Sequence, residues 1–237
     1  MPGNGDATPT PDDAGTPDGA LLVDDESSSI GRISLANGSS WYTYPLPGEG
    51  TIAPTPGTTF FFTPTTGPGF SSAACISATG ITGFGAGMGF GFQLPTTDGT
   101  QVPFDASAFS GLSFYAMSPD APDVVVTFSD IGTYSYAPGA TCAGGADAGP
   151  FPDGGYPVPP CGDSPQAAVA LSSAWQKVTL SFAKVSAFPI SGYYSPTSVD
   201  PSGLFYLTFG LSNPNARIDG GAPLAFHICV AQIYLLP

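Results

Sequence analysis

The sequence predicts an all-β protein, a two-sheet antiparallel β-sandwich of the jelly-roll type that is stabilised by disulfides. Short runs of β-branched and aromatic residues alternate with turn residues, and no segment keeps a helical period. The 32 Gly and 27 Pro residues alone would indicate disorder, but the chain is also 42% hydrophobic and 12% aromatic. This combination indicates many short strands joined by turns, and about ten strands without helices make a sandwich or jelly roll.

The expected strands are short and several alternate cleanly. In the segment 175–182, Val178, Leu180 and Phe182 share one face and polar side chains share the other, as in an antiparallel sheet packed on one side. A single short helical turn capped by Asp105 is expected at residues 104–110. The strands, in chain order, are predicted at residues 20–25, 40–44, 58–62, 73–79, 86–93, 111–117, 123–129, 166–171, 175–182, 204–211 and 224–235.

A glycine-rich run, residues 80–92, falls in one of these strands. A phosphate loop would need a following helix N-terminus and a lysine or acidic partner, and the run has neither. The better interpretation is a strand with one face made of Gly, which lets another backbone or a ligand approach closely.

The chain divides into a tether and a domain. Residues 1–20 contain Pro, Gly, Thr and Asp but no large apolar residue after Met1, so they are predicted to be a disordered tether. Residues 21–237 are predicted to form the jelly-roll domain. Within it, residues 138–165 make an unusually long connection rich in Gly, Pro and Ala.

The charge balance excludes several partners. Four Lys and Arg residues stand against 18 acids, for a net charge of −14, so no cationic patch exists for nucleic acid or an anionic membrane surface. Neutral glycans and cations such as calcium stay compatible. No run of about 18 apolar residues occurs, so no transmembrane segment is expected. Four cysteines in a lysine-poor chain predict an oxidising compartment, and hence a secreted or cell-surface protein whose precursor carries a signal peptide.

The cysteines suggest two bridges. Cys142 and Cys161 lie in the same loop and are predicted to pair. Cys75 and Cys229 lie in two predicted strands, and a bridge between them would close a loop of about 155 residues. The alternative for this second pair is two buried thiols that act as small apolar side chains. The absence of a CxxC spacing and the single histidine argue against zinc.

The sequence contains few residues suited to acid–base or nucleophilic catalysis. We therefore predict that the protein is not an enzyme, and no residue is assigned a catalytic role. His227 is the only histidine and lies mid-strand between Phe226 and Ile228. The only glutamates are Glu26 and Glu49, and most aspartates stand beside Gly or Pro, where turns favour Asp.

Aromatic residues in loops are the positive sign of binding, because such rings stack on the apolar faces of sugars. Core packing is the alternative, and it is the stronger interpretation for Trp41 and Trp175. The candidate ligand-binding residues are Trp41, Tyr42, Tyr136, Tyr156, Tyr193 and Tyr194.

The order of segments resembles secreted bacterial and lipoprotein β-jelly-roll modules of the galactose-binding-like and carbohydrate-binding kind. The likeness runs through LLVDDESSSIGRISLANGSSWYTY, ACISATGITGFGAGMGFGF, SSAWQKVTLSFAKVS and DPSGLFYLTFGL. It implies that a structural calcium lies between an acidic first strand and acids in the last strand. Asp24, Asp25 and Glu26 match the first part, whereas Ala231 and Gln232 stand where acids are expected.

The sequence thus leads to a non-catalytic extracellular module that binds a neutral polysaccharide or glycan and requires no cofactor, with structural calcium as an addition. The first alternative is a self-associating subunit of a surface layer or fibre. The second is a glycoside hydrolase or lyase, which would need two carboxylates in one cleft.

Overall fold

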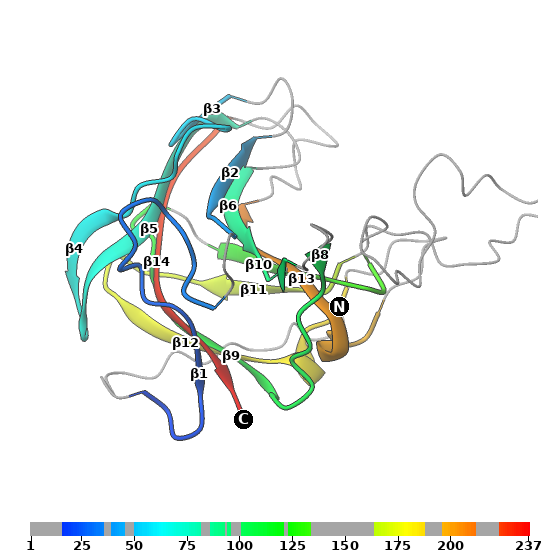
Figure 1. The fold of residues 1–237 in the computed structure, drawn as a ribbon. Helices are drawn as coiled ribbons and strands as arrows, with labels where there is room; N and C mark the ends of the chain where they lie inside the picture. The colour runs from blue at the N-terminus through cyan, green and yellow to red at the C-terminus, as the bar shows by residue number, and fades with distance from the viewer. Residues whose placement is uncertain are drawn as a thin grey trace, which may run out of the picture.

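The protein is a sandwich of two antiparallel sheets that face each other across a shared core (Figure 1). The structure is a computed structural model that describes residues 16–35, 39–45, 50–81, 86–92, 94–95, 101–120, 123–133, 164–187, 196–211 and 223–237. Within these ranges, no helix has the length and apolar character needed to cross a membrane.

The seven-stranded sheet holds the first and last strands of the fold. Its path is β12 (Gln176–Ser181), β9 (Gly111–Met117), β14 (Leu224–Leu236), β5 (Phe70–Ile81) and β3 (Thr51–Ala53). Off this path, β1 (Leu21–Asp24) pairs with β14, and β4 (Thr63–Gly67) pairs with β5.

The five-stranded sheet is built from the remaining long strands. Its order is β11 (Gln166–Ala170), β10 (Asp123–Asp130), β13 (Leu204–Leu211), β6 (Ala86–Gly91) and β2 (Tyr42–Pro45). A small hairpin pairs β7 (Leu94–Pro95) with β8 (Gln101–Val102), and short 3-10 helices lie at η2 (Phe182–Lys184) and η3 (Pro201–Gly203).

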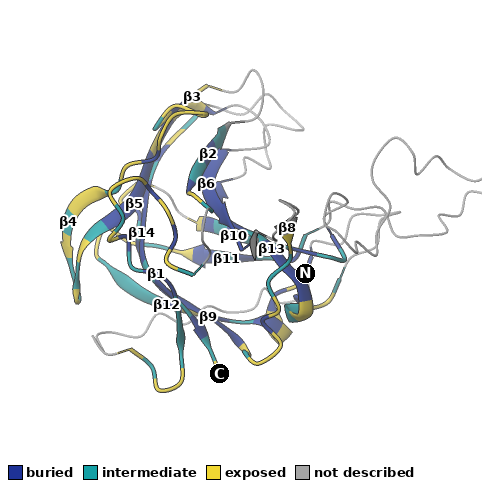
Figure 2. Ribbon diagram, viewed as in Figure 1, coloured by how far each residue is buried: buried dark blue, intermediate teal, exposed yellow. Residues whose placement is uncertain are grey.

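Strict alternation along the strands fills the core. In β14, Phe226, Ile228 and Val230 are buried against the other sheet, and in β13 Leu207 and Phe209 meet them from the opposite side. Dark blue ribbon on both sheets in Figure 2 shows this shared interior. Because one face of each strand is committed to the core, the opposite faces of the two sheets are the surfaces available for function.

The predicted fold class is confirmed, with two corrections. Residues 58–62 are not a strand: Phe60 inserts from a loop onto Trp41, with ring centroids 5.8 Å apart, so its apolar signal came from core packing. Residues 104–110 form a hydrogen-bonded turn rather than a helical one. The Asp105 carboxylate accepts from the Ser107 amide at 2.9 Å, and the chain then extends towards β9.

The Cys75–Cys229 disulfide is present and joins the neighbouring strands β5 and β14. Its two residues are direct cross-strand partners, with Cα atoms 4.1 Å apart. Cys142 and Cys161 lie outside the described residues, so their pairing stays a prediction.

Candidate functional site

The outer face of the five-stranded sheet carries an ordered grid of side chains. Direct cross-strand partners share a face, so the register of β10, β13, β6 and β2 fixes which residues are neighbours. One row runs Thr127, Thr208, Gly89 and Tyr42. The next rows, on either side, are Ser129, Tyr206 and Gly91, and Val125, Gly210, Gly87 and Tyr44.

Strand β6 contributes only glycine to this face, which lowers the middle of the grid. A Cβ atom on Gly87 would lie 2.6 Å from the Tyr44 hydroxyl oxygen, and one on Gly89 would lie 2.7 Å from Thr208 Cγ2. Both distances are too short for a real contact. The glycine face predicted from the sequence is therefore occupied in part by Tyr44 and Thr208, which lie close over the β6 backbone.

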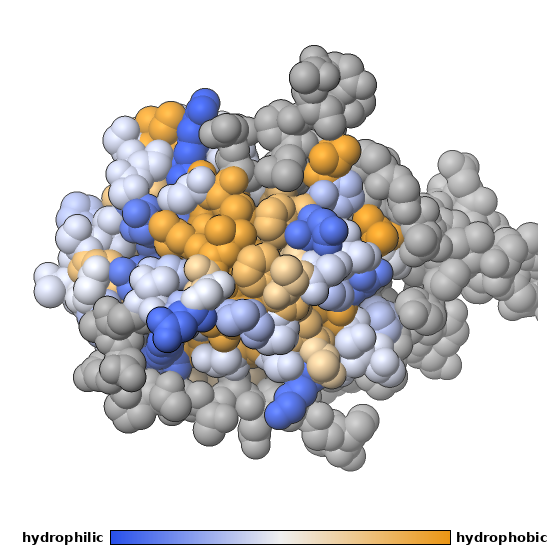
Figure 3. All heavy atoms as spheres, turned by 60° about the horizontal axis from the view of Figure 1, so that its bottom comes forward, coloured by the Kyte–Doolittle hydropathy of each residue, from blue (hydrophilic) through white to orange (hydrophobic). Residues whose placement is uncertain are grey.

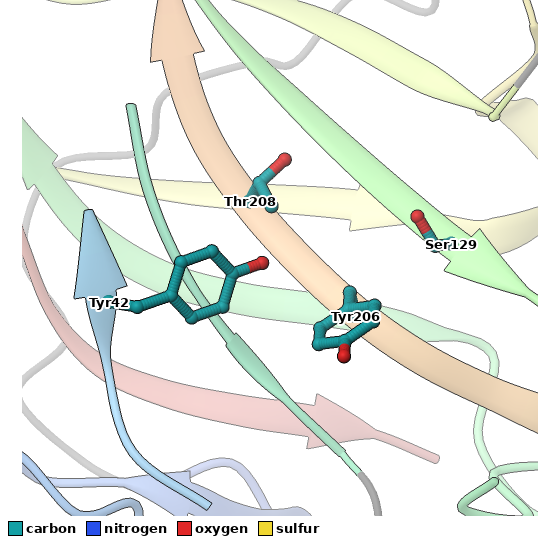
Figure 4. Close-up of a pocket in the computed structure, with 4 residues that line it drawn as sticks. All are labelled: Tyr42, Ser129, Tyr206 and Thr208. Carbon is teal, nitrogen blue, oxygen red and sulfur yellow. The ribbon is translucent and has the colours of Figure 1, made fainter. Parts of the chain in front are cut away.

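Two tyrosines stand on either side of this lowered strip. Tyr42 and Tyr206 have ring centroids 6.1 Å apart and planes at 86°. Together with Ser129 and Thr208 they line an open pocket of about 500 Å³, a volume within the usual range for small-ligand sites. Figure 4 shows the two rings and the two hydroxyl side chains, contributed by strands β2, β10 and β13.

All four lining residues are neutral, and each carries a hydroxyl group. Beside them, burial raises the pKa of Tyr44, which is hydrogen-bonded to the Thr208 side chain and stays neutral. Tyr42 and Tyr44 are neighbours, with ring centroids 6.2 Å apart. The pocket therefore offers aromatic rings and hydroxyl groups without a charge.

Of the predicted binding residues, Tyr42 lies in this pocket. The prediction of Trp41 as a ligand residue is wrong, because its side chain is only 2% exposed and packs on Phe90 and Phe209 in the core. Tyr136, Tyr156, Tyr193 and Tyr194 lie outside the described residues and stay predictions.

Sequence reasoning missed Tyr206, Thr208 and Ser129. The prediction considered aromatic residues expected in loops, whereas Tyr206 lies in strand β13. The signal was available, because Tyr206 and Thr208 alternate with Leu207 and Phe209 and must face outward when those two face the core.

Among the described residues, the only histidine of the chain has no carboxylate hydrogen-bonded to its ring. His227 Nδ1 lies 2.8 Å from Ser77 Oγ, and Nε2 lies 3.1 Å from Cys229 Sγ of the disulfide. A Ser-His-Asp arrangement needs a carboxylate at that position to orient the ring. The described residues that line the pocket include no carboxylate either.

A second polar cluster lies where β1 ends. Asp24 and Glu26 are 0% and 1% exposed. Asp24 Oδ2 accepts from Trp41 Nε1 at 2.6 Å, and Glu26 Oε2 accepts from the backbone amide of Gln232 at 2.8 Å. Glu26 Oε1 is buried without a hydrogen-bond partner. Two buried carboxylates with one unsatisfied oxygen require either protons or a cation.

The electrostatics of this pair follow from burial. Desolvation raises the pKa of Asp24 to about 6, against the opposing hydrogen bond from Trp41. Burial, followed by the nearby charge of Asp24, raises the pKa of Glu26 well above its ordinary value. Asp25 behaves differently: its carboxylate accepts from Ser27 and Ser34, and the pKa of Asp25 is lowered although partial burial opposes this. Asp25 is therefore not part of the buried pair.

The pair leaves one buried oxygen that a cation would satisfy. Among the described residues, no hydrogen-bond donor reaches Glu26 Oε1. A calcium ion takes only oxygen ligands and would satisfy the same atom. Asp24 and Glu26 are the side chains that would hold it, and further ligands would have to be carbonyl oxygens or water.

No family model and no curated protein sequence matches the chain. Solved structures do. The family 11 carbohydrate-binding module of a cellulosomal cellulase from Clostridium thermocellum matches with a TM-score of 0.53 at 12% identity, over 92% of this chain and 94% of that one. The same kind of module from Clostridium thermocellum in complex with a β-1,3-1,4-mixed-linked tetrasaccharide matches with a TM-score of 0.52 at 12% identity, over 92% and 95% of the two chains.

This chain has the fold of a carbohydrate-binding module. The likeness extends along nearly the whole of both chains, so the module is matched as a unit rather than through a shared pair of strands. At 12% identity it concerns the fold alone.

Proposed function

We propose that this chain is a non-catalytic module that binds a neutral polysaccharide on the outer face of its five-stranded sheet. The observation that carries the proposal is the pocket lined by Tyr42, Tyr206, Ser129 and Thr208. The tyrosine rings supply apolar faces on which a sugar ring stacks, and Ser129 and Thr208 supply hydroxyl groups for its hydroxyls.

The absence of charge in this pocket selects the class of glycan. Sulfated and uronic-acid polysaccharides are bound by Arg and Lys side chains, which neutralise the anionic groups. The described residues that line the pocket are Tyr, Ser and Thr, and the chain as a whole carries a net charge of −14. Polyanionic glycans would be repelled, whereas neutral glucans and related polymers would not.

Titration calorimetry with soluble neutral glycans tests this proposal, beginning with a mixed-linked β-1,3-1,4-glucan oligosaccharide. Tyr42→Ala and Tyr206→Ala should each weaken binding by about tenfold, which corresponds to about 1.4 kcal/mol. Tyr234→Ala is the matched control, because Tyr234 is a half-buried tyrosine on the other sheet. The proposal would be contradicted if the wild-type protein bound none of the neutral plant, bacterial and animal glycans.

We also propose that Asp24 and Glu26 hold a structural calcium ion. The support is the unsatisfied Glu26 Oε1 in a buried pair of carboxylates. Adding calcium to chelator-treated protein should raise the melting temperature, and Glu26→Gln should abolish the increase. Asp25→Asn should preserve it, because Asp25 bonds Ser27 and Ser34 instead. An unchanged melting temperature and no heat of binding for the wild type would remove calcium from the account.

We propose a secreted or cell-surface location, because the Cys75–Cys229 bridge needs an oxidising compartment to form. Residues 1–20 would then serve as the tether. Quantifying free thiols in protein isolated from its native host checks this point: thiols at Cys75 and Cys229 would contradict it.

A self-associating surface subunit is the second candidate. Half-buried Phe70, Met117 and Trp175 lie on the outside of the seven-stranded sheet and favour it. Size-exclusion chromatography at increasing concentration separates the two functions, since a binding module elutes as a monomer throughout.

A further inference from the structure

The outer face of the seven-stranded sheet brings three metal-ligating side chains together. Cys75 lies on β5, and His227 and Cys229 lie on β14 at alternate positions that share a face. Their ligand atoms all lie within 4.8 Å of one another. Among the described residues this is the group of three or more His, Cys, Asp and Glu side chains arranged closely enough to share a metal ion.

We propose that reduction of the Cys75–Cys229 disulfide opens a binding site for a thiophilic metal ion such as zinc. Its ligands are the sulfurs of Cys75 and Cys229 and Nε2 of His227, with water in the fourth position. A donor set of two thiolates and one imidazole suits zinc and other soft ions, and it does not suit calcium or magnesium. The site is distinct from the sugar-binding pocket, which lies on the other sheet.

The chemistry balances with a dithiol or phosphine as the reductant. Two electrons and two protons convert the disulfide into two thiols. A dithiol reductant supplies both and becomes a disulfide, whereas a phosphine becomes a phosphine oxide and one water molecule supplies its oxygen and the two protons. Zinc then replaces the two thiol protons, which are released to solvent. The resulting complex of Zn²⁺ with two thiolates and a neutral imidazole carries no net charge, so its burial is not opposed by an uncompensated charge.

The backbone keeps the ligands together after reduction. Cys75 and Cys229 are directly opposed in the antiparallel pair β5 and β14, with Cα atoms 4.1 Å apart, so the sheet itself holds the two sulfurs as neighbours. Two thiolates on a tetrahedral zinc at about 2.3 Å each are about 3.8 Å apart. A change of side-chain rotamer covers that distance without moving the strands.

The imidazole is already oriented. His227 Nε2 lies 3.1 Å from Cys229 Sγ, while Nδ1 lies 2.8 Å from Ser77 Oγ. Ser77 is the direct cross-strand partner of His227. A metal-binding histidine typically donates its second ring N–H to such an oxygen, which fixes the tautomer and directs the other nitrogen at the ion.

Apolar side chains surround the two cysteines. Phe70, Met117 and Trp175 pack around the two cysteines, and the Phe70 and Trp175 ring centroids are 4.8 Å apart. Figure 3 brings the bottom of Figure 1 forward, where hydrophobic side chains gather on this side of the molecule. An apolar shell of this kind strengthens thiolate–metal bonds and limits access of competing ligands. Zinc sites often bring two cysteines together through a CxxC segment. Here the pairing of β5 with β14 brings the two cysteines together instead.

The test uses full-length protein in which Cys142 and Cys161 are changed to Ser, so that only one cysteine pair remains. After reduction with a phosphine and anaerobic desalting, cobalt should bind at one equivalent. Charge-transfer bands from thiolate to cobalt and d–d bands of tetrahedral cobalt should appear, and zinc should abolish them. The oxidised protein should show neither band.

Variants separate a built site from loose thiol binding. His227→Gln and Ser77→Ala should each lower zinc affinity by about 10- to 100-fold, measured by competition with a chromophoric chelator. Lys177→Ala, on strand β12, which β9 separates from β14, should leave it unchanged. If reduction unfolds the domain, zinc should restore the native circular dichroism and melting transition. Failure to restore them, absence of the cobalt bands, equal binding by oxidised protein, or unchanged affinity in His227→Gln would each overturn the proposal.

Discussion

The outer faces of the two sheets carry different kinds of side chains, although the inner faces of both sheets pack into the same core. On the five-stranded sheet, β6 presents glycine, and Tyr42 and Tyr206 stand beside a pocket of about 500 Å³. On the seven-stranded sheet, the corresponding surface is filled by Phe70, Trp175 and a disulfide. The fold thus separates the surface proposed to bind glycan, called the recognising surface below, from a surface that holds the strands together. Each surface predicts a different response to mutation.

The largest expected effect is on the stabilising surface. Cys75→Ser combined with Cys229→Ser removes a cross-link over 154 residues, which the loop-entropy model values at about 5 kcal/mol of unfolding free energy. Urea denaturation measures the loss. Glycan affinity of the fraction that stays folded should be unchanged, because the pocket lies on the other sheet. A loss of affinity without a loss of stability would break the separation of the two faces.

The next effect concerns the dependence of stability on pH. The buried carboxylates Asp24 and Glu26 should make stability pH-dependent, whereas glycan binding in the pocket should not depend on pH. The pKa of Asp24 is raised to about 6, so between about pH 4 and pH 6 the folded protein keeps a proton that the unfolded chain releases. Calcium-free protein should therefore lose stability as pH rises through that window, by about 3 kcal/mol for Asp24 alone. Glu26, whose pKa burial also raises, adds a loss in the same direction.

Thermal denaturation in chelator from pH 4.5 to 7.5 measures this dependence, and Glu26→Gln should reduce it. Glycan affinity should stay constant across the same range, because the described residues that line the pocket are Tyr, Ser and Thr rather than carboxylates. A melting temperature that rises steadily with pH would show that the two carboxylates are ionised and compensated in the folded protein. Calcium should raise stability most at the alkaline end, where it competes least with protons.

Adding a side chain to the outward-facing glycines of β6, here called the glycine strip, should have an intermediate effect on the recognising surface. The strip consists of Gly87, Gly89 and Gly91. A Cβ on Gly87 would clash with the Phe209 carbonyl oxygen and lie 2.6 Å from the Tyr44 hydroxyl, so Gly87→Ala should shift β6 against β13, displace that ring and cost about 1–3 kcal/mol of stability. Because Tyr44 borders Tyr42, glycan affinity should fall as well. Ala170→Ser, on an exposed position of β11 in the same sheet, should change neither quantity. Full retention of affinity in Gly87→Ala would remove the strip from the binding site.

Sequence patterns predicted the sheets better than they predicted the site, for physical reasons. Alternation identifies a strand locally, so β9, β12 and β13 were placed closely from their own residues. The pocket depends on register between strands distant in sequence, as where Tyr42 on β2 and Thr208 on β13 both flank Gly89. No single segment of the sequence determines the register between strands that are distant in the chain. Trp41 shows the same limit, since its burial depends on Phe90 and Phe209 from two other strands.

The smallest expected effect separates ring from hydroxyl within the recognising surface. Tyr44→Phe removes the hydroxyl that bonds Thr208 but keeps the ring over the glycine strip. One neutral hydrogen bond contributes about 1 kcal/mol, and water reaches the half-exposed Thr208 side chain in its place, so the loss of stability should be at or below that value. Glycan affinity should change by less than about threefold, in contrast to the tenfold loss in Tyr42→Ala. Calorimetry on Tyr44→Phe beside Tyr234→Phe measures it. A tenfold loss in Tyr44→Phe would mean that the hydroxyl itself bonds the sugar and that the site extends from Tyr42 along β2.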